Sequence, residues 1–490
     1  MLFNSLEFAI FLPTVFLLYW FVFNKSIRLQ NAFIVVASYF FYACWDWRFL
    51  FLIALTSVSS WYSGYLIKYF SNSSHKKSNN KKEKSVLICN IVLNISILVF
   101  FKYYNFFTES FASFFTLFGK ELNISTLNII LPVGISFYTF QAIGYSIDVY
   151  KGKITATDDI IAFLAFVSFF PQLVAGPIER ATNLLPQFYR QRTFNYNESV
   201  DGLRQILWGL FKKIVVADNC AITVNQVFSS YQEQTGFMLA SAAIFFAFQI
   251  YCDFSGYSDI AIGTAKLFNF KLMRNFNLPY FSRDVAEFWR RWHISLTTWF
   301  RDYIYIPLGG SRVNRYKTVA NTFIVFIVSG FWHGANWTFI LWGVYHALLF
   351  LPLILLNKNR KHLNNVAENR LLPSTKELIQ MIFTFILVTI GWIIFRAENM
   401  PQAITYISNI FNASLFTVPS YGKMQYLINI SAIAFLIIIE WLQRNKQHSL
   451  EIKGTGLFKH RAPRFALYYF LVVCIFYFIG EEKVFIYFQF

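Results

Sequence analysis

Long apolar runs recur along this whole 490-residue chain and limit its fold more than any other feature. A bilayer core of about 30 Å needs about 20 apolar residues in a helix. Hydrophobic residues make up 56% of the chain and charged residues only 14%, whereas an average soluble domain is about 25% charged. The sequence therefore predicts an all-α polytopic membrane protein with about 12 spans, forming one integral membrane domain over residues 1–490. The predicted spans are residues 6–23, 30–45, 49–68, 86–102, 127–148, 203–219, 236–254, 318–332, 336–356, 377–395, 427–443 and 464–480.

A further apolar stretch near residues 159–177 contains helix-breaking residues. Pro171 interrupts it, and Gly176 and Pro177 end it. Backbone groups freed by such breaks are tolerated at membrane depth only inside protein or around a cavity. We therefore expect a re-entrant hairpin here and not a full crossing.

The net charge of +18 is carried by short basic loops between the apolar runs. The strongest lie at residues 76–84, 274–317 and 444–459, and all fall on one side if residues 159–177 do not cross. The positive-inside rule assigns that side to the cytoplasm and places both termini, Phe490 included, outside it. This distribution indicates membrane topology, with lipids as the surroundings, and argues against nucleic acid as a partner.

Residues 284–301 predict an amphipathic helix on the cytoplasmic side. Phe288, Trp289 and Trp299 share one face at helical spacing, and Arg290 falls on the other. His293 falls at the edge of the aromatic face. We expect it at the boundary of the protein or lipid interior and not in open water.

Two histidines lie among tryptophans, His293 in Phe288-Trp-Arg-Arg-Trp-His-Ile-Ser295 and His333 in Gly330-Phe-Trp-His-Gly334. Ionisable groups at membrane depth cost roughly 2.5–3.5 kcal/mol on insertion scales, so they mark candidate sites. A neutral imidazole can exchange a proton near neutral pH and serve as a general base. The alternative is a structural histidine bonded across helices, which we favour for His346.

A polar cluster interrupts the apolar stretch at residues 251–259 and contains Asp253 and Ser255. It is compatible with simple helix capping at the membrane surface. It is equally compatible with the polar lining of a cytoplasmic tunnel mouth, where Arg283 and Arg290 could meet phosphates.

Other kinds of site have little support in the sequence. The chain has no GxSxG nucleophile elbow, no P-loop and no GxGxxG after a strand. Its five cysteines form neither a CxxC pair nor a disulfide spacing. No third ligand stands at a fixed spacing from His293 and His333, so no metal site is predicted.

Five motifs occur together and in order along the chain. They are Pro171-Gln-Leu-Val-Ala-Gly-Pro177, Asp253-Phe-Ser-Gly-Tyr-Ser-Asp259, Phe288-Trp-Arg-Arg-Trp-His-Ile-Ser295, Tyr305-Ile-Pro-Leu-Gly-Gly310 and Gly330-Phe-Trp-His-Gly334. Through them the chain resembles the bacterial branch of the membrane-bound O-acyltransferase (MBOAT) superfamily. That branch contains the membrane subunits of alginate and peptidoglycan O-acetylation and of teichoic-acid D-alanylation. The length and residues 360–490 look more like the alginate type than the shorter D-alanylation protein.

The resemblance implies a helical bundle with re-entrant helices around a central transmembrane tunnel. It also implies that His333 is the essential catalytic histidine and His293 the second, both near the middle of the tunnel. We expect substrate to be bound by residues in and around the motifs, namely Trp289, Arg290, Trp332, Asn336, Asp253, Ser255 and Arg283.

The activity implied by the resemblance is an O-acyltransferase of the bacterial cytoplasmic (inner) membrane. It would take an acyl group, expected to be acetyl, from a cytoplasmic donor such as acetyl-CoA for O-acetylation of an extracytoplasmic polysaccharide. The expected partner is a separate extracytoplasmic esterase-like acceptor protein, and no tightly bound cofactor is expected. The alternatives are a lipid acyltransferase of the same superfamily and a transporter or flippase for a lipid-linked glycan, which the absence of mirrored halves disfavours.

Overall fold

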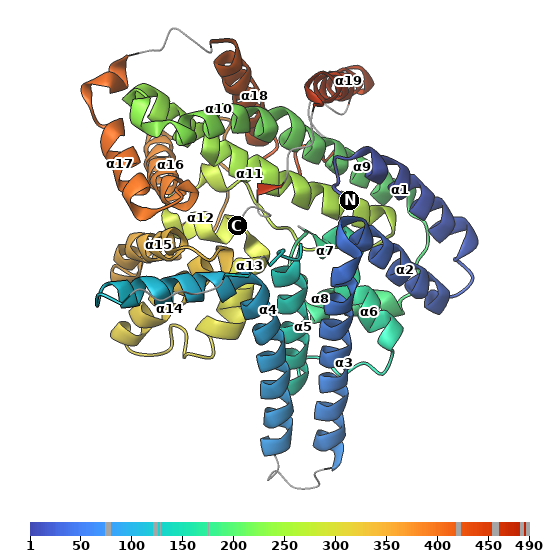
Figure 1. The fold of residues 1–490 in the computed structure, drawn as a ribbon. Coiled ribbons are helices and arrows are strands. Elements are labelled where there is room, and N and C mark those ends of the chain that lie inside the picture. The colour runs from blue at the N-terminus through green and yellow to red at the C-terminus, as the bar shows by residue number, and fades with distance from the viewer. Residues whose placement is uncertain are drawn as a thin grey trace. The chain divides into compact units, whose positions relative to one another are not determined.

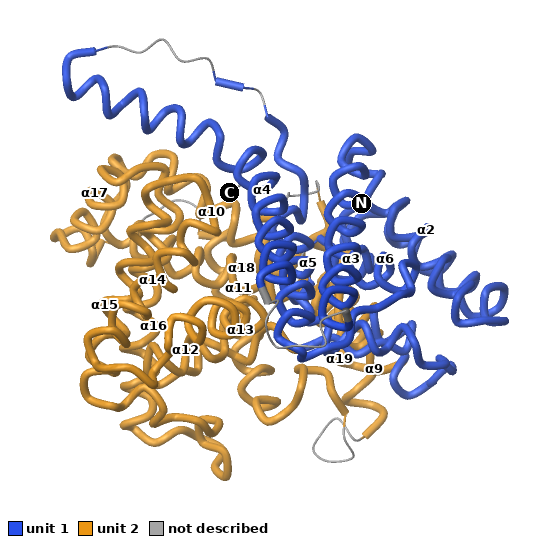
Figure 2. The backbone as a smooth tube through the Cα atoms, turned by 90° about the horizontal axis from the view of Figure 1, so that it is seen from below, with its two compact units in different colours: residues 1–199, 265–273 blue, residues 200–264, 274–490 orange. Residues whose placement is uncertain are grey.

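The computed structural model describes residues 1–73, 80–120, 126–127, 129–174, 176–417, 423–452, 460–480 and 485–486. Regular structure over these residues is helical, without strands. They divide into two compact units, each described by itself: Met1–Ser199 with Ala265–Met273, and Val200–Thr264 with Arg274–Phe490 (Figure 2). Parts of two predicted basic loops, residues 74–79 and 453–459, and Phe490 lie outside the described residues.

Unit 1 holds the N-terminal helices, and three of its long helices, α3, α4 and α5, run side by side (Figure 1). Serines cap the first two long helices, since Ser5 Oγ accepts from Phe8 N and Ser26 Oγ from Leu29 N. The elements are α1 (Leu6–Leu17), η1 (Leu18–Val22), α2 (Ile27–Asp46), η2 (Trp47–Phe49), α3 (Leu50–Ser73), α4 (Asn80–Thr116), α5 (Ile135–Tyr150), α6 (Ile160–Ser168), α7 (Phe170–Leu173), α8 (Ala181–Leu184) and η3 (Leu185–Tyr189).

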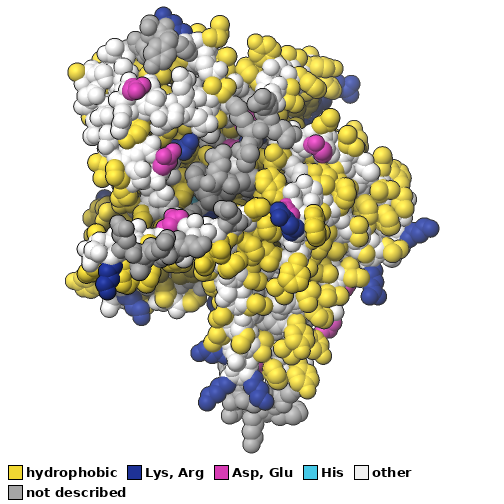
Figure 3. Space-filling view, viewed as in Figure 1, with side chains coloured by type: hydrophobic (Ala, Val, Ile, Leu, Met, Phe, Trp, Pro, Cys, Tyr) yellow, Lys and Arg dark blue, Asp and Glu magenta, His cyan; other side chains and the backbone are white. Residues whose placement is uncertain are grey.

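Buried amides and hydroxyls join α3, α4 and α5. Asn90 on α4 donates to Ser146 Oγ on α5 at 2.8 Å, and Ser60 Oγ on α3 donates to Asn90 Oδ1 at 3.3 Å. Such bonds hold helices together where apolar surroundings supply no hydrophobic drive. The outer face of these helices is largely hydrophobic, and Lys and Arg side chains gather at the far end of the α3–α4 hairpin (Figure 3).

The stretch predicted to be re-entrant forms two short helices. The longer one, α6, has nine residues and rises about 14 Å, less than half the thickness of a bilayer core. Phe169 leaves the helical conformation (φ −49°, ψ 106°) between α6 and α7, and its side chain is buried. The path of this stretch relative to a membrane stays a prediction.

Unit 2 holds the C-terminal helices and all of the candidate site. The elements are α9 (Tyr196–Leu210), η4 (Phe211–Ala217), α10 (Asp218–Ser229), η5 (Tyr231–Glu233), α11 (Gly236–Leu267), η6 (Pro279–Phe281), α12 (Val285–Arg291), α13 (Ile294–Phe300), η7 (Arg301–Tyr305), α14 (Arg315–His333), α15 (Trp337–Leu355), α16 (Thr375–Arg396), α17 (Met400–Ile410), η8 (Ala413–Phe416), α18 (Lys423–Leu442) and α19 (Arg461–Phe478). The first residues of α9 and the last of α11 belong to unit 1.

Among the described residues, 7 helices are long and apolar enough to cross a membrane. This is fewer than the about 12 predicted spans. Predicted spans 30–45 and 49–68 fall in one continuous helical run, Ile27–Asn72, and others form helices too short for this test, such as α5 with 16 residues. The protein is a multi-pass membrane protein, and its number of crossings stays a prediction.

Candidate active site

The structure corrects the single amphipathic helix predicted over residues 284–301. The segment forms two short helices, α12 and α13, with Trp292 and His293 between them. Trp292 N still donates to Phe288 O at 2.8 Å, but His293 takes the left-handed conformation (φ 42°, ψ 55°), which a continuous helix does not allow. This backbone region is uncommon and costly for residues other than glycine. The spacing of apolar residues contains no signal for the break, because the chain is helical on both sides of it.

The His293 side chain is buried, with 1% of its surface exposed. Its Nδ1 lies 3.1 Å from Asn275 Oδ1, and the Ser295 hydroxyl donates to the same oxygen at 2.9 Å. Phe254 packs edge-on against the imidazole with 4.6 Å between ring centroids. Burial lowers the pKa of His293 to about 3, so the imidazole is neutral at physiological pH.

His333 is the last residue of α14, at the corner that leads into α15, and only 4% of its surface is exposed. Glycines bring the two helices of this hairpin together. A Cβ added at Gly330 would lie 2.2 Å from Phe339 O, and one at Gly343 would lie 2.4 Å from Phe326 O. Gly330 therefore allows α14 and α15 to pack closely, and this packing positions the end of α14, where His333 lies.

One indole joins the two histidines. The Trp332 ring lies 6.0 Å from the His293 ring and 5.0 Å from the His333 ring, between centroids. His333 also packs edge-on against Trp342 at 5.2 Å, and Trp342 against His346 at 5.0 Å. We call these five side chains the ring cluster. It places the imidazoles of His293 and His333 near one indole inside a buried aromatic region.

A small polar pocket of ≈ 20 Å³ borders Asn275, whose side chain contacts His293. Asn275 and Ser258 form part of its wall, and so do side chains of the segment from Gln443 to Ser449. That segment belongs to the basic loop at 444–459, which the positive-inside rule assigns to the cytoplasm. The cavity thus connects a predicted cytoplasmic loop with the hydrogen-bond partner of His293.

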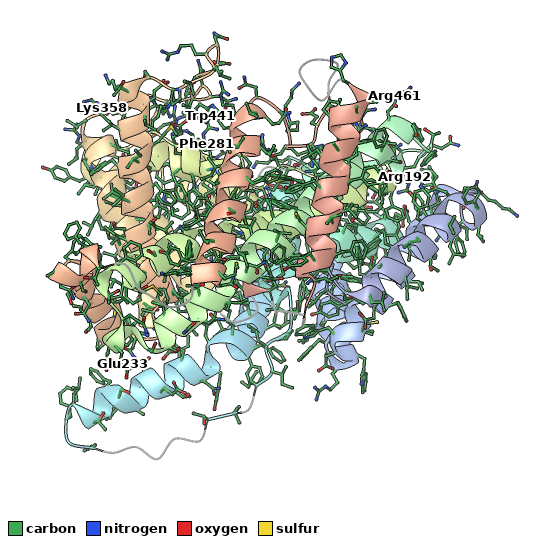
Figure 4. All side chains as sticks on the ribbon, turned by 90° about the horizontal axis from the view of Figure 1, so that it is seen from above. Arg192, Glu233, Phe281, Lys358, Trp441 and Arg461 are labelled. Carbon is green, nitrogen blue, oxygen red and sulfur yellow. The ribbon has the colours of Figure 1, made fainter. Side chains whose placement is uncertain are left out.

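A second cavity of ≈ 280 Å³ is mostly apolar and shares Tyr251, Leu278 and Glu440 with the polar pocket. The Tyr251 hydroxyl donates to Glu440 Oε1 at 2.8 Å and so forms part of the wall between the two spaces. Phe281, which lines the apolar cavity, packs edge-on against Trp441 at 5.2 Å (Figure 4).

Comparison with known proteins shows to which family the chain belongs. Residues 155–396 match the MBOAT, membrane-bound O-acyltransferase family. The chain is 38% identical to the probable alginate O-acetylase AlgI of Azotobacter vinelandii over 87% of this chain and 81% of that protein. The chain belongs to the membrane-bound O-acyltransferase family. It is also 40% identical to the probable alginate O-acetylase AlgI of Pseudomonas aeruginosa over 82% of this chain and 73% of that protein. The Helicobacter pylori peptidoglycan O-acetyltransferase is 31% identical, over 100% of this chain and 98% of that protein. The protein is therefore an O-acyltransferase.

Two predicted binding residues of this acyltransferase lie among the rings of the site. Trp332 joins the two histidines, as described above. Trp289, on α12, packs edge-on against His346 at 5.0 Å and Trp342 at 5.5 Å. Both tryptophans can therefore shape the space around the imidazoles, and contact with substrate stays a prediction for each.

Arg283, Arg290 and Asn336 are engaged by other parts of the protein. Arg283 pairs with Glu287 at 3.0 Å, and Arg290 donates to the carbonyl oxygens of Asn359 and His362, each at 2.7 Å. Asn336 caps α15, with its Oδ1 accepting from Thr338 N and its Nδ2 donating to Glu398 O. These contacts order loops and helix ends, and substrate binding by the three residues stays a prediction.

Asp253 and Ser255, on α11, face two consecutive buried lysines of the π-helical segment η4. Lys213 Nζ lies 2.8 Å from Asp253 Oδ1, and Lys212 donates to Ser255 Oγ at 2.8 Å. Lys212 also pairs with Asp259 at 2.6 Å. Asp253 Oδ2 accepts from Ile486 N at 2.7 Å, so this carboxylate also ties down part of the C-terminal segment. Their predicted contact with substrate stays untested beside these structural roles.

Sequence reasoning missed Asn275, which contacts His293, and gave Ser295 no role. Asn275 stands in a polar segment 18 positions before His293, where no periodicity or motif marks it. Ser295 lies inside the Trp-His-Ile-Ser motif, and its place two residues after the histidine is the one signal that could have drawn attention to it.

The chemistry available to the ring cluster is proton transfer. Among the described residues, no group of three or more His, Cys, Asp or Glu side chains could hold a metal ion. A buried neutral imidazole can accept a proton from a hydroxyl as that hydroxyl attacks a carbonyl carbon. Aromatic walls exclude water, which would otherwise compete with the hydroxyl for an activated acyl group.

Proposed function

We propose that this O-acyltransferase moves an acetyl group from a cytoplasmic thioester, such as acetyl-CoA, to a hydroxyl outside the cytoplasm. Its product would be an O-acetylated extracytoplasmic polysaccharide, and its location the bacterial inner membrane. The observation that carries the proposal is the link from His293 through Trp332 to His333, beside a cavity that borders a predicted cytoplasmic loop. The names of the relatives support acetyl as the acyl group, since they are O-acetylases and an O-acetyltransferase.

The donor would enter on the side of the polar pocket, which would have to widen to admit a thioester. Its wall contains Lys446, next to the predicted cytoplasmic surface, whereas Arg283 and Arg290 already bind carboxylate or carbonyl oxygens. The thioester end would then approach the ring cluster from the side of Asn275. This path differs from the mouth expected around Arg283 and Arg290, because both side chains are engaged within the protein.

In the transfer step the acceptor hydroxyl oxygen forms a bond with the thioester carbonyl carbon. The hydroxyl proton passes to the His333 imidazole, the carbon–sulfur bond breaks, and the thiolate leaves with the bonding electron pair. The protonated imidazole returns its proton to the thiolate, so the products are an acetyl ester and a free thiol. General acid–base help of this kind is typically worth about 10²–10⁴-fold.

The acceptor would be a serine on a separate extracytoplasmic esterase-like protein, which passes the acetyl group on to the polysaccharide. The proposal of a partner protein rests on the resemblance to the family that the five motifs carry. No tightly bound cofactor is proposed.

Mass spectrometry of cell-envelope polymers from three matched strains tests this function. The strains carry the native gene, a deletion, and the His333→Ala variant at equal protein level. We expect base-labile acetyl esters on a polysaccharide in the first strain and their loss in the other two. Unchanged polysaccharide esters together with altered lipid acylation would contradict the proposal and favour a lipid acyltransferase.

A further inference from the structure

The left-handed turn at His293 is held by Asn275, a residue from a separate segment of the chain. Asn275 is fully buried, with 0% of its surface exposed, and so is Ser295 beside it. The backbone makes the first connection, because Ile294 N donates to Asn275 O at 2.8 Å. Two residues further, Asn277 N donates to Arg291 O at 2.9 Å. These two bonds hold the segment of Asn275 against the break between α12 and α13.

The side chain of Asn275 makes the second connection. Its Oδ1 lies 3.1 Å from His293 Nδ1, and it accepts from the backbone N and the hydroxyl of Ser295 at 3.4 Å and 2.9 Å. Its Nδ2 donates to Ser258 Oγ on α11 at 3.1 Å. One amide thus connects the His293 turn with α11.

The same contacts decide which atom of the Asn275 amide faces His293. A backbone N–H can only donate, so the amide atom that meets Ser295 N must be oxygen. That oxygen also faces His293 Nδ1, and an oxygen there can only accept. Nδ1 therefore carries the proton, and in a neutral imidazole the lone pair then lies on Nε2.

We propose that Asn275 is a positioning residue that fixes His293 as its Nδ1–H tautomer and thereby keeps its Nε2 as a proton-accepting atom beside His333, which takes the hydroxyl proton in the transfer step. This inference rests on the proposed function. It assigns a role to a residue outside the five motifs. It also gives a reason for the strained backbone at His293, since strain of this kind persists where surrounding contacts over-determine a functional geometry.

The Asn275 amide determines which tautomer of His293 is populated. Without the Asn275 oxygen, the neutral imidazole can protonate on either nitrogen, and the Ser295 hydroxyl offers Nδ1 a neighbour at 3.4 Å that can donate as well as accept. If the Ser295 hydroxyl donates to Nδ1, most molecules would then carry the proton on Nε2, where it blocks proton acceptance by His293. The loss should appear in kcat and leave KM nearly unchanged.

Two substitutions of Asn275 and one control substitution nearby separate the roles of the amide. Asn275→Ala removes the acceptor, Asn275→Asp keeps an oxygen for His293 and Ser295, and Asn277→Ala is a matched control two residues along the same segment. We expect kcat to fall about 10- to 100-fold in Asn275→Ala, the usual cost of removing a partner that orients a working histidine. Asn275→Asp should recover most of the rate, and Asn277→Ala should stay within about twofold of native at equal thermal stability.

A double-mutant cycle with His293→Ala completes the test, with labelled acetyl-CoA as donor and purified acceptor protein present. If Asn275 acts through His293, adding Asn275→Ala to His293→Ala lowers kcat no further. Two independent losses that multiply would overturn the inference, and so would an Asn275→Ala enzyme of native kcat. Absence of transfer by the native protein would instead contradict the proposed function. Failure of the inference about Asn275 and failure of the proposed function are therefore distinguishable.

Discussion

Two buried polar regions of unit 2 meet their hydrogen-bonding needs in opposite ways. In the ion-pair cluster, Lys212 lies 2.6 Å from Asp259, and Lys213 lies 2.8 Å from Asp253 and 2.9 Å from Asp218. In the aromatic region, both nitrogens of His346 are buried without a hydrogen-bond partner among the described residues, as is Nε1 of Trp289, Trp342 and Trp392. The ion-pair cluster satisfies its charged groups with one another. The aromatic region leaves buried polar atoms without a hydrogen-bond partner among the described residues.

The difference separates architecture from chemistry. A buried charge must be paired, and removing one partner typically costs about 3–5 kcal/mol, so the lysines and carboxylates belong to the fold. A buried polar atom without a partner costs about 1–3 kcal/mol and persists in native proteins where water or a ligand meets it or where it has a working role. The indole nitrogens of Trp289, Trp342 and Trp392 are therefore candidates for contact with substrate, whereas we expect His346 to act in packing.

The largest effect should follow from breaking the ion-pair cluster. Lys212→Ala leaves the largely buried Asp259, whose side chain is 16% exposed, with Gln205 as its remaining hydrogen-bond partner and should destabilise the protein by about 3–5 kcal/mol. The control combines Lys212→Met with Asp259→Asn, which removes both charges and keeps an acceptor for Gln205, and it should recover most of that loss. The free energy of unfolding of the single and the double variant is measured in mixed detergent micelles. A double variant as unstable as Lys212→Ala would show that the pair does more than satisfy charge.

A smaller effect is expected where the helix hairpin holds the ring cluster in place. In Gly330→Ala the new Cβ would meet Phe339 O at 2.2 Å, so α14 and α15 must separate. Overpacking of this kind costs about 1–3 kcal/mol, and the shift at His333 should lower acyl transfer as well. Activity and unfolding are measured on the same preparation. Native activity at reduced stability would show that His333 tolerates displacement of its helix.

The smallest effect on activity is expected at the third histidine of the ring cluster. His346 is fully buried, and it fits beside α16 only because residue 391 is glycine, where a Cβ would lie 2.8 Å from its Nε2. His346→Ala should destabilise the protein by about 1–3 kcal/mol and leave kcat per folded molecule within about twofold. A tenfold fall in kcat at native stability would instead bring His346 into the chemistry.

The sequence predicted the helical class, because apolar length is a local signal. The motifs also singled out His293, His333 and Trp332, whose rings the structure brings together, and their roles in catalysis stay predictions. The break at Trp292 and His293 has no local signal, since the bonds that hold it come from Asn275 in a different segment.

Charged residues also show what the sequence alone does not predict. Arg283 and Arg290 have the positive charge that a phosphate site needs, but a sequence does not show whether the charge is already paired. The structure gives Arg283 a carboxylate from Glu287 and gives Arg290 two loop carbonyls. Partners contributed by distant loops decide which charges remain for a ligand.

The most direct test of the division between fold and chemistry is the rate of acetyl transfer by His333→Ala. Purified native and variant proteins are compared at equal amount and equal unfolding midpoint, with labelled acetyl-CoA and an acceptor. The variant should lose transfer by about 10²–10⁴-fold while unfolding like the native protein, because it removes a proton acceptor and no charge partner. Transfer at a near-native rate would contradict the account and remove His333 from the chemistry.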